Sequence, residues 1–204
     1  YYMLNLQPLS RLIASQADAF GDRTALRYRD YRREVWKDVS WRFFASQVRA
    51  ASNALLELGV GVQEKVAVFA QNMVENLFVD FGCYAIRACS IPFYATSSES
   101  QVQYMINDAS IRYVFVGEQY QYDVAFRVLK MCPTLRQLII VDNAVRKNPQ
   151  DQVSVYFYDF IRTGEADQHA VEIERRMCEA DKDDLANILY TSGTTGLSKG
   201  VMLT

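Results

Sequence analysis

The spacing of apolar residues predicts two helices in the first part of the chain. Apolar positions at helical spacing over 9–20 follow Pro8, which suits a first helical turn, and the pattern stops at Gly21. A second helical pattern runs over 41–58, with Ser40 as the expected N-cap and a glycine directly after its end. Both patterns leave one polar face, so these are amphipathic helices that cover a core.

A β-hairpin and a parallel sheet are predicted from the remaining runs. Alternating stretches at 24–30 and 34–41 flank a charged turn, which is the pattern of a hairpin. Continuous apolar runs then alternate with helical patterns: strands near 66–70, 90–93, 112–116 and 137–141, and helices near 73–88, 98–108 and 118–131. Such strands are buried on both faces, so we expect an α/β fold whose mostly parallel sheet has helices on both faces.

The last part of the chain continues this pattern after a polar interruption. The segment 143–153 is the most polar and predicts a surface loop; a linker between domains is the alternative to a single domain. A short strand with a helical turn is expected over 154–164, an amphipathic helix over 167–180 and an apolar strand over 183–190.

Composition excludes several classes of protein. The 204 residues carry a net charge of −2, which gives no basic footprint for nucleic acid. Basic residues gather at 23–37 among acidic ones, as on a solvated hairpin face. One histidine and four widely spaced cysteines predict reduced thiols and no metal cluster. The best apolar run is short and holds Asp80, so no transmembrane segment is expected, and the start of the chain lacks a signal-peptide pattern.

The segment "TSGTTGLSK", from Thr191 to Lys199, carries the candidate chemistry. Its hydroxyls and glycines offer many donors, and successive N–H groups in such turns form anion-binding concavities. Lys199 adds a positive charge, so a polyphosphate is the expected ligand, although an ordinary connecting loop has the same composition. It is not a Walker loop, because Ser198 rather than glycine precedes the lysine. Since β-prone residues follow, we expect the segment to join two strands.

Three other positions have both a functional and a structural interpretation. Gln71 and Asn72 follow a predicted strand, where open α/β sheets bind ligands, but Asn72 is also a candidate helix N-cap. Glu75 then falls in the first helical turn, where negative charge is favourable. Tyr94 is expected to be a packed aromatic at a strand end, with a place near a substrate channel as the alternative.

The run "YTSGTTGLSKGVMLT" resembles the phosphate-binding signature of the adenylate-forming superfamily, which includes acyl- and aryl-CoA synthetases, luciferases and peptide-synthetase adenylation domains. Tyr190 through Gly196 match that signature, as do Lys199, Gly200 and Val201. Ser198 stands where the family usually has proline. Upstream, "QNMVEN" and "IPFYATSS" are similar to the amino-terminal part of long-chain fatty acyl-CoA synthetases.

The resemblance implies a fold, a reaction and a set of site residues. Residues 1–204 are expected to be part of an amino-terminal adenylation (AMP-binding) domain, with the carboxyl-terminal domain absent. Family enzymes join a carboxylate to ATP, release pyrophosphate, and transfer the acyl group to coenzyme A, with Mg²⁺ near the phosphates. The residues expected to bind the nucleotide are Thr191, Ser192, Gly193, Thr194, Thr195, Gly196 and Lys199. Of these, Thr194, Thr195 and Lys199 are the expected catalytic residues.

The function expected from this resemblance is the amino-terminal part of a long-chain fatty acid–CoA ligase. Family members are much longer, so we expect this chain to be inactive alone and to self-associate through a truncation surface. A synthetase for an aryl or shorter acid, and a non-catalytic binding domain of the same fold, remain alternatives. A cytoplasmic location is expected, with peripheral membrane contact left open.

Overall fold

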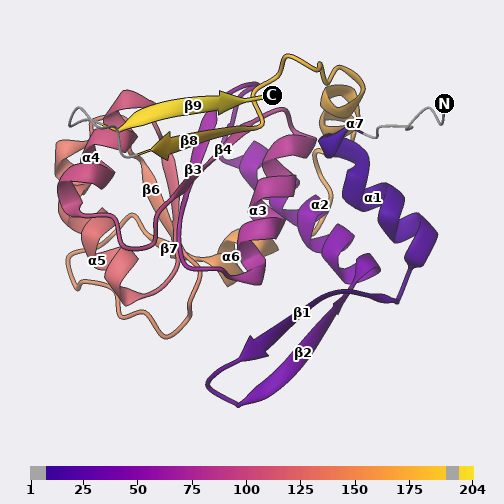
Figure 1. Ribbon diagram of the computed structural model, residues 1–204, viewed down its shortest axis with the longest axis horizontal. Helices are drawn as coiled ribbons and strands as arrows, with labels where there is room; N and C mark the ends of the chain where they lie inside the picture. Colours follow the sequence, from indigo (N-terminus) through magenta and orange to yellow (C-terminus); the bar gives the residue numbers. More distant parts are fainter. Residues whose placement is uncertain (1–7, 192–197) are drawn as a thin grey trace.

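A central sheet organises the molecule, whose computed structural model describes residues 8–191 and 198–204 (Figure 1). Its strands are β3 (Lys65–Phe69), β4 (Cys89–Phe93), β5 (Tyr113–Val116), β6 (Gln137–Ile140), β7 (Val155–Tyr156), β8 (Asn187–Thr191) and β9 (Lys199–Leu203). They lie in the order β7-β6-β5-β3-β4-β8-β9. Neighbouring strands run parallel except for the antiparallel pair β8 and β9. The predicted mostly parallel sheet is therefore confirmed.

Helices cover both faces of this sheet, as the continuous apolar strands predict. One face carries α1 (Leu9–Phe20), α2 (Trp41–Glu57), α3 (Val74–Ala85), α6 (Phe157–Arg162) and α7 (Ala170–Cys178). The other carries α4 (Glu99–Asp108) and α5 (Gln119–Val128). Alternate residues of one strand supply the two cores: Val68 belongs to the first, Ala67 and Phe69 to the second. Figure 1 shows α4 and α5 on one side of the strands and α1 to α3 on the other.

The predicted amino-terminal hairpin forms a separate two-stranded sheet. β1 (Thr24–Asp30) and β2 (Val35–Ser40) pair antiparallel, and Figure 1 shows them projecting from the body of the molecule. Ser40 ends the hairpin and caps α2, because its Oγ accepts a hydrogen bond from the N–H of Phe43 at 3.1 Å. The expected N-cap of the second helix is therefore confirmed.

Two predicted helices end earlier than expected. The helix expected over 73–88 stops at Ala85, because Arg87 adopts a left-handed φ of 58° and the N–H of Ala88 closes back on the Cys83 carbonyl at 2.8 Å. The helix expected over 118–131 stops at Val128 and continues as a 3₁₀ turn over Leu129–Met131. These are shifts of boundary and not of element type.

The polar segment 143–153 connects β6 to β7, two neighbouring strands of the same sheet. All four cysteines are free thiols; Cys83, Cys89 and Cys132 are buried and Cys178 is exposed. The expectation of reduced cysteines on apolar faces thus holds for three of them. No helix in the described ranges 8–191 and 198–204 combines the length and apolar character that crossing a bilayer requires.

Candidate functional site

The strands that flank the candidate phosphate segment form a hairpin. β8 and β9 pair antiparallel with Thr191 opposite Lys199 and Tyr190 opposite Gly200. The segment therefore joins two strands, as predicted, and does not open a helix. The predicted residues Ser192, Gly193, Thr194, Thr195 and Gly196 lie outside the described residues. The structure places the remaining two, Thr191 and Lys199, directly across the hairpin, and both are exposed.

The opposite face of this hairpin is fixed to α4. Tyr190 is buried, and its Oη donates a hydrogen bond to Asp108 Oδ2 at 2.6 Å while its ring stands edge-on to Tyr104. Burial and the nearby carboxylate raise the pKa of Tyr190, so its hydroxyl stays a donor. A Cβ at Gly200 would lie 2.8 Å from Ile188 Cγ2, so the glycine allows close packing on this side.

Alternation along the strand then decides where the polar residues of the motif lie. Residues directly opposite in an antiparallel pair share a face, so Thr191 and Lys199 lie on the face that Tyr190 does not occupy. The packed side holds the hairpin in place, and the other side presents a hydroxyl and an ammonium group. This arrangement is suited to an anion that approaches residues 191 and 199.

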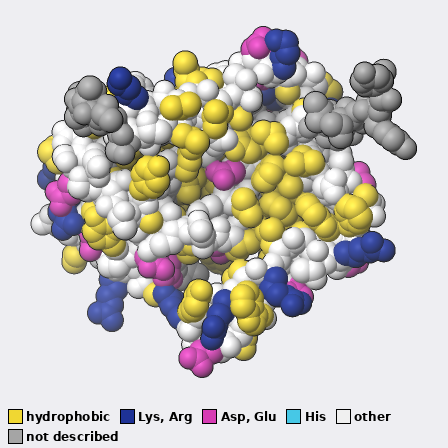
Figure 2. Space-filling model, viewed as in Figure 1, with side chains coloured by type: hydrophobic (Ala, Val, Ile, Leu, Met, Phe, Trp, Pro, Cys, Tyr) yellow, Lys and Arg dark blue, Asp and Glu magenta, His cyan; other side chains and the backbone are white. Residues whose placement is uncertain are grey.

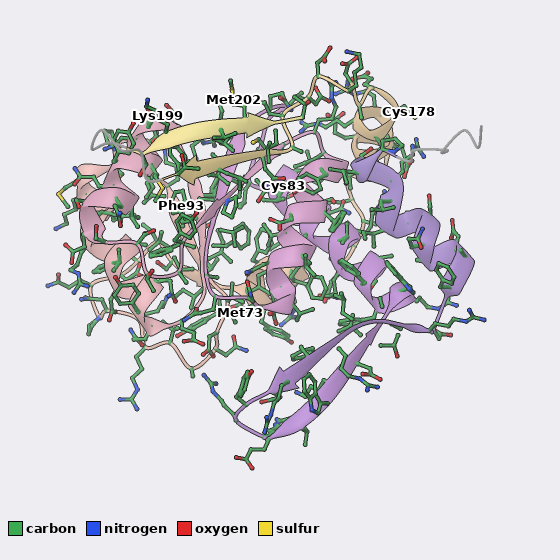
Figure 3. All side chains as sticks on the ribbon, viewed as in Figure 1. Met73, Cys83, Phe93, Cys178, Lys199 and Met202 are labelled. Carbon is green, nitrogen blue, oxygen red and sulfur yellow. The ribbon has the colours of Figure 1, made fainter. Side chains whose placement is uncertain are left out.

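A cleft of about 660 Å³ opens at the same edge of the sheet. Because β8 runs parallel to β4, the carboxyl end of β8 lies at the edge where β3 and β4 also end. Polar residues of the cleft are Gln71, Asn72, Asn76 and Asp80; Val68, Met73, Leu77, Phe93 and Tyr94 are among its apolar residues. Figure 3 shows Phe93, at the end of β4, between Lys199 and Met73. Ligands of open α/β sheets bind at this edge.

Two of the structural expectations for this region are wrong. Tyr94 is 69% exposed and lines the cleft, because no described helix covers the end of β4 at this point. The N-cap of α3 is Met73 and not Asn72, which is exposed and lines the cleft. Asn76 Nδ2 instead donates to the Gln71 carbonyl at 2.7 Å and closes the turn before the helix.

Gln71 and Glu75 are placed as the sequence indicates. Gln71 follows β3, and its Nε2 donates to Glu118 Oε2 at 2.9 Å, which joins the ends of β3 and β5. Glu75 lies in the first turn of α3, where burial raises the pKa of its carboxyl group. Gln71 thus lines the cleft together with the exposed residues Asn72 and Tyr94, whereas Glu75 does not line it.

Asp80 is a polar residue of the cleft that sequence reasoning did not single out as functional. Its Oδ1 accepts a hydrogen bond from Ser90 Oγ at 2.6 Å, across the contact between α3 and β4. Burial raises the pKa of Asp80 to about 6, only partly offset by that bond. A carboxylate within the apolar run of α3 was the available signal, since buried acids with raised pKa values concentrate at functional sites.

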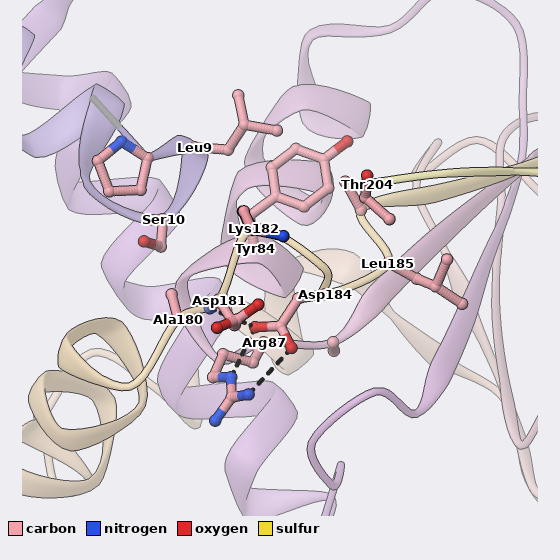
Figure 4. A pocket seen from close by; sticks show the side chains of 13 residues that line it. Leu9, Ser10, Tyr84, Arg87, Ala180, Asp181, Lys182, Asp184, Leu185 and Thr204 are labelled. Atoms are coloured by element: carbon pink, nitrogen blue, oxygen red, sulfur yellow. Dashed lines mark hydrogen bonds and ion pairs between the residues drawn. The ribbon is translucent and has the colours of Figure 1, made fainter. Parts of the chain in front are cut away.

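A second cavity, of about 680 Å³, lies at the other end of β9 (Figure 4). Leu9, Tyr84, Leu185 and Thr204 are among its lining residues. In this cavity the guanidinium of Arg87 donates hydrogen bonds to both carboxylate oxygens of Asp184, at 2.7 and 2.9 Å. None of the predicted site residues lies here, and Lys199 is at the opposite end of the strand from Thr204. We therefore place the candidate site at the cleft and not at this cavity.

Comparison with curated proteins identifies relatives that are named as acyl-CoA ligases or synthetases. The chain is 29% identical over 170 residues to the long-chain-fatty-acid–CoA ligase FadD15 of Mycobacterium tuberculosis, covering 83% of this chain and 27% of the relative. It is 26% identical over 215 residues to the putative acyl-CoA synthetase YngI of Bacillus subtilis, covering 96% of this chain and 37% of the relative. The chain thus spans about a third or less of these relatives' lengths.

Solved structures share the fold at low sequence identity. The anthranilate CoA ligase AuaEII in complex with anthranoyl-AMP has a TM-score of 0.79 at 20% identity, covering 96% of this chain and 34% of that one. A fatty acyl CoA synthetase of Mycobacterium tuberculosis has a TM-score of 0.73 at 19% identity, covering 97% of this chain and 34% of that one. The family described as "AMP-binding enzyme" matches residues 13–204. The hairpin that carries the signature lies within that match, and the chain belongs to the AMP-binding, adenylate-forming enzyme family.

Proposed function

We propose that this chain supplies the nucleotide-phosphate site of an ATP-dependent long-chain fatty acid–CoA ligase. The observation that carries the proposal is the pairing of Thr191 with Lys199 at the two ends of the "TSGTTGLSK" segment, beside the cleft at the ends of β3 and β4. Together these offer a cation and hydroxyl donors next to a partly apolar space. A site that joins an acyl carboxylate to ATP needs this combination.

The reaction has two steps. A carboxylate oxygen attacks the α-phosphorus of ATP, the bond to the β-phosphate oxygen breaks, and pyrophosphate leaves with the negative charge. The sulfur of coenzyme A then attacks the acyl carbon, the thiol loses its proton, and AMP leaves. Lys199 and the hydroxyl and amide donors of residues 191–196 stabilise the charge that develops on pyrophosphate in the first step. We assign the catalytic role to Thr194, Thr195 and Lys199.

The size of this effect follows from charge-assisted hydrogen bonding. Each bond from a donor to phosphate contributes about 1.5–3 kcal/mol, and losing one donor that acts in the transition state costs about 10²–10³ in rate. The described residues hold no group of three His, Cys, Asp or Glu side chains that would form a metal site. We propose that Mg²⁺ accompanies the ATP phosphates, as it does in many nucleotide sites.

Two alternatives to the proposed fatty-acid ligase define the tests of substrate and activity. The names of relatives at 26–29% identity favour a fatty acid, whereas the structure at a TM-score of 0.79 is an anthranilate ligase. A synthetase for an aryl acid would accept anthranilate or benzoate in place of palmitate. A binding domain that has lost catalysis would hold ATP without exchanging pyrophosphate in the presence of any acid.

We further propose that residues 1–204 form part of an amino-terminal adenylation domain. Since the chain spans 27–37% of the lengths of FadD15 and YngI, acyl-CoA formation is proposed to need regions outside the share that it matches. The purified chain is then expected to bind ATP weakly and to form no acyl-CoA. Accumulation of palmitoyl-CoA from palmitate, ATP, Mg²⁺ and coenzyme A would contradict that expectation.

The decisive experiment compares Lys199, at the start of β9, with Lys182, in the turn that precedes β8. Lys199→Ala is expected to weaken binding of ATP with Mg²⁺ by about 10- to 100-fold in calorimetric titration, the loss of one charge-assisted contact. Lys182→Ala is the matched control, because Lys182 is exposed and its one ion pair among the described residues is with its neighbour Asp183 at 2.8 Å. Equal ATP affinity of the wild-type chain and the Lys199→Ala variant would refute the assignment.

We also propose that the chain self-associates through the surface of β8 and β9. β9 lies at an edge of the sheet among the described residues, with Leu189, Val201, Met202 and Leu203 each at least 40% exposed. Figure 2 shows hydrophobic side chains gathered on the face that carries these strands and α3. An exposed apolar edge pairs readily with a second strand. Sedimentation velocity over a range of concentrations tests this, and a single monomer throughout would argue against it.

A further inference from the structure

The hairpin β1–β2 carries an exposed aromatic and basic surface on its outward side. Arg29 and Trp36 stand opposite each other in the register, so their side chains share this side. Trp36 is 63% exposed, and Tyr31 in the connecting turn is 80% exposed. The guanidinium of Arg29 lies 5.5 Å from the centroid of the Tyr31 ring. Figure 2 shows hydrophobic and basic side chains mixed on the projecting hairpin.

The inward side of the same hairpin is packed in the ordinary way. Val39 is buried in the core and Tyr28 packs against it, although both lie on the same two strands as the exposed residues. The exposure of Trp36 and Tyr31 is therefore not caused by a loosely packed hairpin. Large aromatic side chains held in water on a projecting element indicate a contact with something outside the chain.

The charge of this element is opposite to that of the whole chain. Residues 23–40 include six basic and three acidic residues, a net charge of +3, whereas the chain carries −2. Lys37 forms an ion pair with Asp30 at 2.8 Å, and Arg27 forms an ion pair with Asp38. Arg29 and Arg33 enter no ion pair with any described residue. The guanidinium of Arg29 thus remains beside the exposed Tyr31 ring, and Arg33 is exposed in the same turn as Tyr31.

We propose that this hairpin docks on an anionic phospholipid bilayer, with Trp36 and Tyr31 in the headgroup region and Arg29 and Arg33 on lipid phosphates. Tryptophan and tyrosine favour the membrane interface because each has an apolar ring and a polar group. Arginine binds phosphate through two parallel N–H groups. A hairpin that projects from the body of the molecule can reach a flat bilayer, and its exposed arginines match the charge of an anionic one.

Docking on a bilayer would bring the proposed ligase close to its acyl substrate, but the docking proposal does not depend on the proposed function. A long acyl chain partitions into bilayers, so a ligase held there meets its substrate at the surface. The hairpin and the cleft lie on separate elements, and vesicle binding can be measured with no ATP present. Failure to bind vesicles would leave the ATP site untouched, and failure to bind ATP would leave the docking surface untouched.

The first test uses the intrinsic fluorescence of the wild-type protein. Of the two tryptophans, Trp41 is already packed against Phe44, so a change of environment on binding reports Trp36. We expect co-sedimentation with vesicles of phosphatidylcholine and phosphatidylglycerol, a blue shift of emission, and much weaker binding to phosphatidylcholine alone. Absence of binding to the anionic vesicles, or binding without a blue shift, overturns the proposal.

The second test compares variants at matched sites. Arg29→Gln with Arg33→Gln is expected to weaken binding by about 25-fold, about fivefold for each basic residue at an anionic surface. Trp36→Ala with Tyr31→Ala should abolish co-sedimentation. Tyr158→Ala with Arg162→Gln is the control, because that pair has the same 5.5 Å arrangement and Tyr158 is 60% exposed on another element.

Each result decides the question. Loss of binding in both hairpin variants and retention in the control variant support docking. If the arginine variant loses binding while the Trp36 variant keeps it, the hairpin is a general polyanion surface and the bilayer proposal fails. If the control variant weakens binding as much as the hairpin variants, the location is wrong. Circular dichroism on all variants shows whether they remain folded.

Discussion

Replacing Asp80→Asn should stabilise the protein at neutral pH, although it removes a natural carboxylate. Asp80 is half-buried where α3 meets β4, and its contact with Ser90 Oγ at 2.6 Å is the one hydrogen bond of this carboxylate within the described residues. An asparagine has the same shape and its amide oxygen accepts the same bond, so packing is kept and only the charge is removed. The experiment isolates the cost of ionising this side chain inside the fold.

The magnitude follows from the pKa of Asp80, which burial raises from 3.8 to about 6. At roughly 1.4 kcal/mol per pKa unit, ionisation in the folded state costs about 3 kcal/mol. The folded state holds its proton longer than the unfolded state, so this contribution is present below about pH 4 and lost as pH rises through about 6. Burial raises the pKa values of Cys83 and Tyr84 nearby, so they stay neutral in this window.

The assay is urea denaturation of the wild type and the variant across this pH range. The two proteins should have similar unfolding free energies near pH 4, and the variant should be more stable by about 3 kcal/mol near pH 8. Asp184→Asn is the control with opposite sign, because the Arg87 guanidinium lowers the pKa of Asp184 and removing that charge should destabilise the protein at pH 8. A difference between wild type and Asp80→Asn that does not change with pH would refute the reasoning.

Two further predictions concern the anchor of the hairpin and the glycines that allow close packing or a left-handed turn. Tyr190→Phe removes the 2.6 Å hydrogen bond to Asp108 and should lower the unfolding free energy by about 1.5–3 kcal/mol. A double-mutant cycle with Asp108→Asn measures the coupling between the two side chains. Additive effects of the two substitutions would contradict the prediction. Gly164→Ala would place a Cβ 1.9 Å from the Ala50 carbonyl oxygen and should cost more than about 3 kcal/mol or prevent folding. At Gly59 an added Cβ would have no atom within 4 Å, and the backbone φ of 75° is the one source of strain. Gly59→Ala should therefore lower the unfolding free energy by about 1–2 kcal/mol. Equal thermal midpoints for the two glycine variants would be evidence against this account.

The elements whose local sequence and tertiary environment agree were predicted well. The apolar runs that became β3 and β5 are buried on both faces, so hydrophobicity and β-propensity act in the same direction. Ser40 is a strong N-cap type in front of an amphipathic pattern, and its hydroxyl makes the expected bond. The hairpin β8–β9 followed from the apolar runs on both sides of the phosphate segment.

The cleft was not predictable from local pattern, because it depends on which strands become neighbours. β3 lies between β5 and β4, so the chain leaves the ends of adjacent strands toward opposite faces, and a gap opens there. Asn72 is a better N-cap type than Met73, but the side chain of Asn76 closes the turn from within the helix and changes the outcome. Tyr94 was expected to be packed, since its sequence does not show that this strand end has no cover.

The geometry of the hairpin fixes the two described residues that are proposed to bind phosphate, Thr191 and Lys199, on one face. Electrostatic stabilisation of a leaving group is effective when the donors are fixed before the charge appears, since no reorganisation is then needed. Tyr190 supplies that fixing: it is buried, bonded to Asp108 and one residue away from Thr191, whose side chain must therefore point to the other face. Lys199 is held to the same face by its register with Thr191. The anchor Tyr190 and the proposed phosphate-binding residue Thr191 are thus neighbours on β8 that face opposite sides, and Lys199 faces the same side as Thr191 from β9. Loosening the anchor should therefore weaken phosphate binding, although Tyr190 itself lies on the other face of the sheet.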